Sequence, residues 1–199
     1  MKSNNYTIDD LLIRNDDTED SFHRQRNELF IEIIQPIYER YENHLKEIRP
    51  IPEIDFSDLI NKATTYITNG QYNKEFKYVI IDEFQDISID RYKLVKAIKE
   101  NNPACKLFCV GDDWQSICRF SGSDIALFKE FEEYFGFTVK SKIETTYRFH
   151  NPLLNLSSEF IQKNPNQAKK ELRGTSNSKS TTYQIKYSIS DNQDDTNTL

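Results

Sequence analysis

Sulfur and glycine are both scarce in this 199-residue sequence, which has three cysteines, one methionine and five glycines. Cys105, Cys109 and Cys118 are odd in number and show no Cys-x-x-Cys spacing. A disulfide framework and a zinc site are therefore both disfavoured, and we expect a reducing cytoplasm. The sequence also lacks an apolar run of transmembrane length, and no apolar segment follows Met1 and Lys2 as in a signal peptide.

Basic residues are fewer than acidic ones: the sequence has 26 Lys and Arg and 32 Asp and Glu, which gives a formal net charge of -6. The chain as a whole is therefore not a basic clamp for nucleic acid. The one basic stretch is 161–187, which holds six Lys or Arg and a single acid. Aromatic residues make up 13% of the chain, which argues against wholesale disorder and favours one or two folded domains.

The N-terminal third has the pattern of helices. After a polar start at 1–20, apolar residues recur every three or four positions from Ser21 to about Lys46, which predicts a helix that Pro36 kinks or splits. A linker at 49–55 precedes a second predicted helix, from Phe56 to an end near Gly70.

Strands and helices alternate after Gly70. This order predicts an α/β fold with a parallel sheet flanked by helices. Asn151 and Pro152 predict a helix start, with the asparagine as N-cap and the proline at the first helical position. The polar tail from Thr175 holds at most one short strand, at 183–189. The other strands are expected at 78–81, 106–110 and near 137–143, and the other helices at about 90–100 and 124–135.

Each of the three predicted strands is followed by a polar cluster. The clusters are Asp82-Glu83-Phe84-Gln85-Asp86, "GDDWQS" at 111–116 and "ETTYRF" at 144–149. Because ligands of open parallel sheets bind beyond the carboxyl ends of the strands, we expect these polar side chains to gather at one edge.

Nucleoside triphosphate hydrolysis is the chemistry that suits such an edge. The carboxylate of Asp82 is a suitable ligand for Mg²⁺, and the carboxylate of Glu83 is suited to act as a base that orients or deprotonates water. Gln115 can touch a terminal phosphate, and Arg148 can neutralise charge on a transferred phosphoryl group.

Plainer interpretations of the same residues stay open. Asp82 can cap a turn, and Asp112 and Asp113 can belong to an ordinary turn. Arg148 can form a surface ion pair, which contributes less than ~1 kcal/mol. Trp114 and Phe120 are of the types most often found in a core.

Three segments resemble successive motifs of the Rep/UvrD branch of superfamily 1 DNA helicases, and within it the bacterial DNA helicase IV group. They are "VIIDEFQDIS", "VGDDWQSICRFSGSD" and "ETTYRFHNPLLNLSSEFIQKNPNQAKKEL". The resemblance runs from about Asp55 to Arg173. It implies a RecA-like sheet of the P-loop NTPase type, incomplete here. A helical accessory segment would lie at 1–54, the central part of the ATP-binding motor domain at 55–150, and the start of a second motor domain at 151–199.

The resemblance implies an ATP-dependent 3′-to-5′ DNA helicase, with DNA repair as its setting. ATP and Mg²⁺ would be cofactors, and single-stranded or duplex DNA and further parts of a longer helicase chain would be partners. Asp82 would bind Mg²⁺, Glu83 would activate water, and Gln115 and Arg148 would contact the γ-phosphate. Phe120 would stack on a DNA base, with Arg119 and Trp114 as neighbouring DNA contacts.

The chain departs from the family pattern in two places. Cys118 stands where family members usually have tyrosine. The phosphate-cradling sequence G-x-x-x-x-G-K-[ST] is missing, because none of the five glycines is followed by lysine. We therefore expect the isolated chain not to hydrolyse ATP.

Two alternatives stay open. One is a non-catalytic or vestigial module, derived from such a helicase, that binds DNA or protein. The other is a metal-dependent nuclease built on Asp82, Glu83 and Asp86. The sequence Glu75-Phe76-Lys77 argues against a nuclease, because it lies before the strand and not after a paired aspartate.

Overall fold

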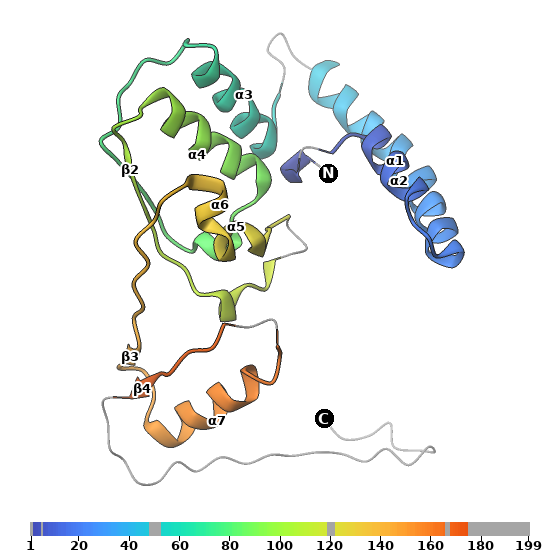
Figure 1. Ribbon diagram of the computed structural model, residues 1–199. Helices are drawn as coiled ribbons and strands as arrows, with labels where there is room; N and C mark the ends of the chain where they lie inside the picture. The colour runs from blue at the N-terminus through green and yellow to red at the C-terminus, as the bar shows by residue number, and fades with distance from the viewer. Residues whose placement is uncertain (1, 5, 48–52, 119–121, 166–167, 175–199) are drawn as a thin grey trace, which may run out of the picture. The chain divides into compact units, whose positions relative to one another are not determined.

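The computed structural model describes residues 2–4, 6–47, 53–118, 122–165 and 168–174. The chain divides into two compact units, Met1–Val139 and Lys140–Leu199 (Figure 1). The strand predicted at 183–189 lies outside the described residues. Within the described part, no helix is both long and apolar enough to cross a membrane.

The first unit begins with helical elements, and the polar start at 1–20, for which the residue pattern predicted no helix, includes η1 (Lys2–Asn4) and α1 (Ile8–Asp16). Thr7 caps α1 and forms a capping box with Asp10. The helix predicted from Ser21 continues through Pro36 as one element, so Pro36 does not split it, and the alternative of a kink stays a prediction. Helical periodicity continues on both sides of the proline, which removes only one backbone donor. The elements are η1 (Lys2–Asn4), α1 (Ile8–Asp16), α2 (Ser21–Glu47) and α3 (Phe56–Thr68).

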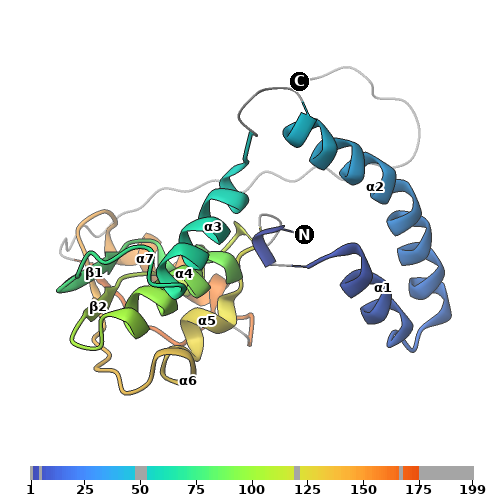
Figure 2. The same ribbon diagram turned by 90° about the horizontal axis from the view of Figure 1, so that it is seen from above.

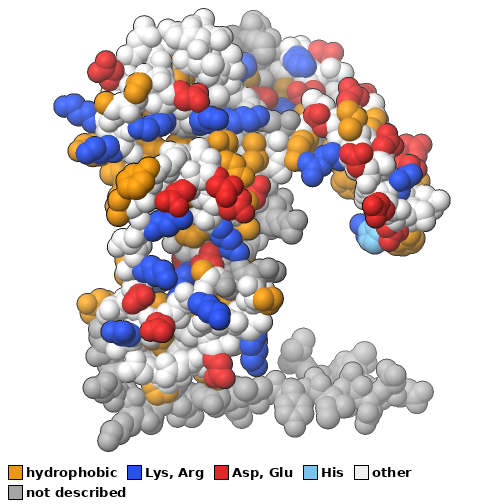
Figure 3. All heavy atoms as spheres, in the orientation of Figure 1, with side chains coloured by type: hydrophobic (Ala, Val, Ile, Leu, Met, Phe, Trp, Pro, Cys, Tyr) orange, Lys and Arg blue, Asp and Glu red, His pale blue; other side chains and the backbone are white. Residues whose placement is uncertain are grey.

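Helices α1 and α2 pack side by side (Figure 2). Only Ile31 of α2 is buried. Hydrophobic side chains stay exposed along α2 and mix with charged ones over the α1–α2 pair (Figure 3). They include Phe22, Leu29, Phe30, Ile33, Ile37 and Tyr41.

The predicted strand–helix–strand order is confirmed. Strands β1 (Tyr78–Ile81) and β2 (Lys106–Cys109) pair in parallel, with Tyr78 opposite Lys106 and Ile81 opposite Cys109. Helix α4 (Ile89–Asn101) connects them and packs on α3. The carboxyl ends of both strands therefore lie at the same edge of the sheet.

An aromatic core lies against one face of this sheet. Phe84, Ile87 and Leu127 are its buried centre, and Ile81 and Cys109 of the strands pack against it. Phe84 belongs to η2 (Phe84–Asp86), and its ring meets that of Phe131 edge-on at 5.3 Å. The helix predicted at 124–135 is present as two short helices, α5 (Ile125–Lys129) and α6 (Phe131–Phe135).

The other face of the two strands is exposed. Side chains alternate between the two faces of a strand, so Tyr78 and Ile80 of β1 point away from the aromatic core, with Phe108 of β2 beside them. Ile80 is 72% exposed and Phe108 61% exposed. We call Tyr78, Ile80 and Phe108 the bare sheet face. The fold is mixed α/β as predicted, although mostly helical in its described residues.

The third predicted strand, near 137–143, is wrong. Phe137, Val139 and Ile143 are exposed, and the next strand starts later, as β3 (Thr145–Thr146). Alternating apolar residues give that stretch a strand pattern, but a strand also needs a neighbour to pair its backbone groups. In the described residues, β3 pairs instead with β4 (Arg173–Gly174), in parallel and within the second unit.

Helix α7 (Asn151–Ile161) of the second unit starts close to the predicted position, with proline in its first turn. Its N-cap is His150, so the assignment of Asn151 as N-cap is wrong. The Asn151 side chain has another role, because its Oδ1 accepts a hydrogen bond of 2.9 Å from the Gly174 N–H. This bond ties the start of α7 to β4.

Candidate functional site

The turn after β1 presents Asp82 and Glu83 to solvent. On either side of them, Val110 N–H donates to the Ile81 carbonyl and Phe84 N–H donates to the Val110 carbonyl, both at 2.9 Å. Phe84 is completely buried. The chain is thus fixed to the end of β2 before and after the two acids, which remain exposed in between.

Glu83 has an unusual backbone conformation. Its φ of 51° makes it the one non-glycine residue with positive φ in the described part of the chain. This left-handed conformation costs roughly 1 kcal/mol in a non-glycine residue, and such strain concentrates at functional sites. The Glu83 Oε2 accepts a 2.6 Å hydrogen bond from the Gln85 side-chain amide, and Asp82 Oδ1 accepts one of 2.9 Å from Glu83 N–H. Both carboxylates are therefore oriented.

The turn after β2 is organised by Asp112. One oxygen of its carboxylate accepts from Trp114 N–H at 3.1 Å and caps η3 (Asp113–Gln115). The other accepts from the Gln115 side-chain amide at 2.8 Å. Gln115 is exposed, so its carboxamide is held at the surface of the sheet edge.

Gln85 joins the two turns. It is 1% exposed, and its Oε1 accepts a 2.9 Å hydrogen bond from the Asp112 N–H while its Nε2 donates to Glu83. The chain Glu83–Gln85–Asp112–Gln115 is called the strand-end network below. Gly111 makes room for it, because a Cβ at that position would lie 2.7 Å from Gln85 Oε1.

Three of the predicted site residues, Asp82, Glu83 and Gln115, thus lie at the carboxyl edge of one sheet. Trp114 is half-buried in η3 at the same edge. Arg119 and Phe120 lie outside the described residues.

Arg148 follows β3 in the second unit, where it is exposed. Its N–H donates to Thr146 Oγ1 at 3.3 Å. The role predicted for its guanidinium across a nucleotide cleft stays a prediction.

Sequence reasoning assigned no role to Gln85, Gly111 or Asp112 in this network. One pattern points to the first two. Gln85 stands between two hydrophobic positions of a turn that packs on the core, and a buried amide requires partners. Gly111 directly follows a predicted strand, where close approach of another chain segment favours glycine.

The edge fits Mg²⁺ by the chemistry of its donors. Asp82 offers an exposed carboxylate, and Mg²⁺ is bound in proteins by one or two carboxylates together with water and phosphate oxygens. The amide of Gln115 is the kind of neutral donor that a phosphate oxygen accepts from.

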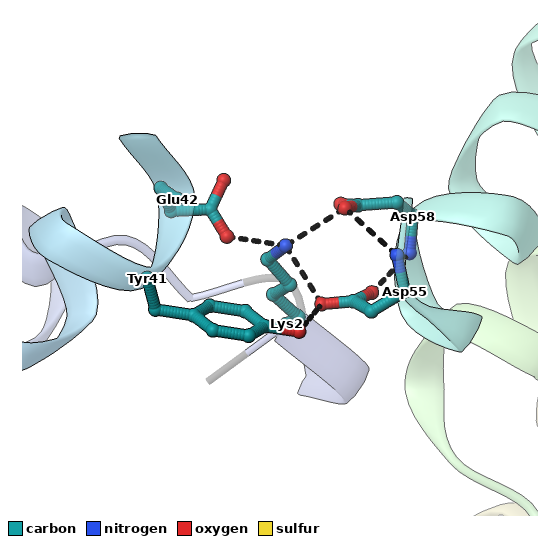
Figure 4. A network of polar contacts seen from close by, with 5 residues as sticks. All are labelled: Lys2, Tyr41, Glu42, Asp55 and Asp58. Carbon is teal, nitrogen blue, oxygen red and sulfur yellow. Dashed lines mark hydrogen bonds and ion pairs between the residues drawn. The ribbon is translucent and has the colours of Figure 1, made fainter. Parts of the chain in front are cut away.

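A second acidic cluster, Glu42, Asp55 and Asp58, has a different function. Lys2 Nζ lies among these three carboxylates, 2.8 Å from an oxygen of Asp55 and of Asp58 and in an ion pair with Glu42 (Figure 4). Tyr41 OH donates to Asp55 at 3.2 Å. A lysine ammonium thus holds the place that a cation would need. We call Lys2, Glu42, Asp55 and Asp58 the Lys2 clamp.

Protonation in the clamp follows from its contacts. Partial burial by itself lowers the pKa of Lys2, but hydrogen bonds to Asp55, Asp58 and Glu42 outweigh it and raise that pKa above its usual range. Burial by itself raises the pKa of Asp55, but the hydrogen bonds that its carboxylate accepts from Lys2, the Asp58 N–H and Tyr41 together outweigh burial and lower that pKa. Both groups stay charged at neutral pH.

No disulfide joins Cys105, Cys109 and Cys118 in the structure. Burial raises the pKa of the Cys109 thiol to about 11. Burial and the carboxylate of Asp86, to which the thiol is hydrogen-bonded, raise the pKa of Cys118. Both thiols are therefore neutral at pH 7 and poor nucleophiles.

Acids and an amide at the carboxyl edge of parallel strands are typical of α/β nucleotide-binding domains. The chain belongs to the UvrD/REP helicase family, because residues 3–136 match the family's "UvrD/REP helicase N-terminal domain". The family resemblance of the sequence motifs is thereby confirmed.

Curated relatives are bacterial helicases. DNA helicase IV of Escherichia coli is 38% identical over 147 residues, which are 74% of this chain and 21% of that protein. The ATP-dependent DNA helicase PcrA of Staphylococcus epidermidis is 29% identical over 160 residues, which are 78% and 21%. The putative ATP-dependent DNA helicase YjcD of Bacillus subtilis is 29% identical over 141 residues, which are 68% and 18%. The chain spans about a fifth of the length of these relatives.

Proposed function

We propose that this chain is part of an ATP-dependent 3′-to-5′ DNA helicase and contributes the water-activating half of the ATP site. The observation that carries the proposal is the strand-end network, which holds Glu83 and Gln115 at one edge of a parallel sheet. The names of the relatives describe the same chemistry, ATP-dependent action on DNA. The bacterial cytoplasm is the proposed location.

Each residue at the edge has a proposed role. The Asp82 carboxylate holds Mg²⁺ through an oxygen or a bound water. Glu83 takes a proton from the attacking water, and its hydrogen bond from Gln85 fixes the direction of its carboxylate. Gln115 donates its amide to the terminal phosphate. Arg148 stabilises the negative charge that develops on the transferred phosphoryl group, which bound MgATP supplies.

The proposed DNA contacts follow from residue types near η3. Phe120 offers a ring for stacking on a base, and Arg119 and Trp114 are its neighbouring contacts. Gln115 and Phe120 are five positions apart in the sequence, so the proposed phosphate contact and the proposed base contact are close along the chain.

The proposed domain organisation assigns 1–54 to a helical accessory segment, 55–150 to the central part of a RecA-like motor domain and 151–199 to the start of a second one. The bare sheet face supports an incomplete RecA-like core, because a parallel sheet normally has both faces covered. Further parts of a longer helicase chain would supply that cover.

The isolated chain is proposed to be inactive as an ATPase. None of its glycines is followed by the lysine that a phosphate-cradling loop requires. The test compares phosphate release by the purified chain and by Glu83→Gln, with and without single-stranded DNA and Mg²⁺. We expect no difference between the two proteins. A DNA-stimulated rate that Glu83→Gln abolishes would contradict the proposed inactivity and establish Glu83 as the base.

A second candidate is a non-catalytic module that binds DNA or another protein. The bare sheet face favours a protein contact, since Ile80 and Phe108 form an exposed apolar pair across β1 and β2. DNA binding is tested by the salt dependence of a gel shift with single-stranded DNA. Loss of the shift in Phe120→Ala would support a DNA-gripping loop, and no shift at low salt would leave only the protein contact.

A further inference from the structure

Gln85 occupies a position that suits it for more than filling space. It lies in η2 between the two strand ends, is 1% exposed, and uses both ends of its amide on two different turns. The carbonyl end holds Asp112 N–H at 2.9 Å, and the amide end holds the Glu83 carboxylate at 2.6 Å. A buried amide with both partners made resists rotation, because any rotation would leave a polar group without a partner.

The bonds continue on both sides of Gln85. Gln85 accepts a hydrogen bond from the Asp112 N–H. The Asp112 carboxylate in turn accepts a hydrogen bond of 2.8 Å from the Gln115 side-chain amide. Ser116 Oγ donates to the backbone carbonyl of Gln85 at 3.4 Å, which adds a second contact between η2 and the turn after β2. A displacement of Gln115 therefore reaches Glu83 through three hydrogen bonds and one buried side chain.

The space around Gln85 is also specific. A Cβ on Gly111 would lie 2.7 Å from Gln85 Oε1 and 3.0 Å from Gln85 N, and 2.8 Å from the ring of Phe128. Residue 111 thus lets the backbone of the second turn approach the glutamine closely enough for the Asp112 bond. This close approach is an independent observation that the two turns are built to meet at Gln85.

We propose that Gln85 is a positioning residue that couples the turn carrying Gln115 to the carboxylate of Glu83. Contact of a phosphate with Gln115 displaces the Asp112–Gln115 turn, and Gln85 passes this displacement to Glu83. Water activation thereby depends on the presence of the terminal phosphate. The inference rests on the proposed function for its biological meaning, but the mechanical connection exists without ATP.

Trp114 gives the connection a direct readout. It is the only tryptophan in the chain and follows Asp113 in η3, so its indole N–H gives one assignable NMR resonance. The experiment measures the shift of this resonance caused by Glu83→Ala in two backgrounds, native and Gln85→Met. Methionine has a similar shape to glutamine but cannot donate an N–H to Glu83. Gln71→Met, at an exposed glutamine, is the matched control background.

We expect Glu83→Ala to shift the indole resonance in the native and Gln71→Met backgrounds. In the Gln85→Met background the shift should fall at least about threefold, since only coupled residues show such non-additivity. Equal shifts in all three backgrounds would overturn the proposal. The proposal would also be overturned if Glu83→Ala alone, with Gln85 intact, did not shift the indole resonance.

Gln85→Glu decides the question if Gln85→Met does not fold. A neutral glutamic acid donates its O–H to Glu83 as the amide does, whereas a glutamate places two carboxylates next to each other. Over the pH range in which an ordinary glutamate stays ionised, the effect of Glu83→Ala on the Trp114 resonance should therefore grow as the pH falls in Gln85→Glu and stay constant in the native background. The same pH profile in both backgrounds contradicts coupling. Because neither ATP nor DNA is added, failure here is distinct from failure of the ATPase proposal.

Discussion

The carboxyl edge of the β1–β2 sheet and its bare face differ sharply although both belong to the same two strands. At the edge, each turn is held by backbone bonds between the strands and by a buried glutamine. On the bare face, Ile80 and Phe108 lie 72% and 61% exposed. The side chains of the edge are oriented by residues close to the strand ends. The apolar side chains of the bare sheet face, in contrast, are not covered by any other element of the described residues.

This difference shows which parts of the proposed site can be organised locally. The side chains with proposed roles in proton transfer and phosphate contact are oriented by residues one to three positions away and by one neighbouring turn. Covering a sheet needs whole helices or strands from elsewhere. A chain that spans about a fifth of the length of its relatives can therefore carry an ordered strand edge next to an exposed apolar sheet face.

The largest expected effect separates the covered face from the bare one. Phe84 is completely buried among the rings of Phe128, Phe131 and Phe135, so Phe84→Ala should lower the free energy of unfolding by about 3–5 kcal/mol. Ile80→Ala, on the bare face, should change it by less than about 0.5 kcal/mol. Urea denaturation of both variants measures the contrast. Equal losses would mean that the bare face is covered in solution.

A smaller effect is expected at the meeting point of the two turns. Gly111→Ala places a methyl group against Gln85 Oε1 and the Phe128 ring, and such overpacking costs about 1–3 kcal/mol. Gly70→Ala is the control, because a Cβ there meets no atom within 4 Å and only the positive φ opposes it. Thermal unfolding of the Gly111→Ala and Gly70→Ala variants measures the loss of stability caused by each substitution. The strand-end network would be refuted if Gly111→Ala were as stable as the native chain.

The Lys2 clamp should give the smallest and the most pH-dependent effect. Lys2→Met removes charged hydrogen bonds from partly exposed carboxylates, with an expected loss of about 1–2 kcal/mol at pH 7. Because the pKa of Asp55 is lowered in the folded state, the clamp's contribution is full above the unfolded pKa of about 4 and disappears as the pH falls through the lower folded value. Native and Lys2→Met chains should therefore become equally stable in acid. Their urea midpoints at pH 7 and below pH 3 test this, and a constant difference would contradict it.

Local patterns predicted most of the first unit. The two paired strands and α4 follow from short apolar runs and helical spacing, and parallel pairing brought Asp82, Glu83 and Gln115 to one edge as expected. The strand near 137–143 had the same kind of pattern and failed, because pairing depends on a neighbour that local sequence does not specify.

Long-range side-chain contacts were beyond prediction for a related reason. Gln85 and Asp112 are 27 positions apart, and Lys2 reaches partners 53 and 56 positions away. Lys2 stood in a polar stretch with no periodic pattern, and only the folded backbone brings it to α3. In the sequence, Gln85 is one of several polar residues in the stretch 82–86. Only the folded structure shows that its side chain is buried.

Paramagnetic Mn²⁺ tests most directly whether Asp82, Glu83 and Gln115 share one edge, because it takes the oxygen ligands of Mg²⁺. The measurement is the broadening of side-chain N–H resonances in the ¹⁵N-labelled chain at low Mn²⁺. The resonances of Gln115 and Trp114 should broaden first, and Asp82→Asn should prevent this, while Asn61 near the Lys2 clamp stays sharp. A metal-binding edge shared by the two strand ends would be contradicted if Mn²⁺ did not broaden the Gln115 resonances and if the broadening of other resonances persisted in Asp82→Asn.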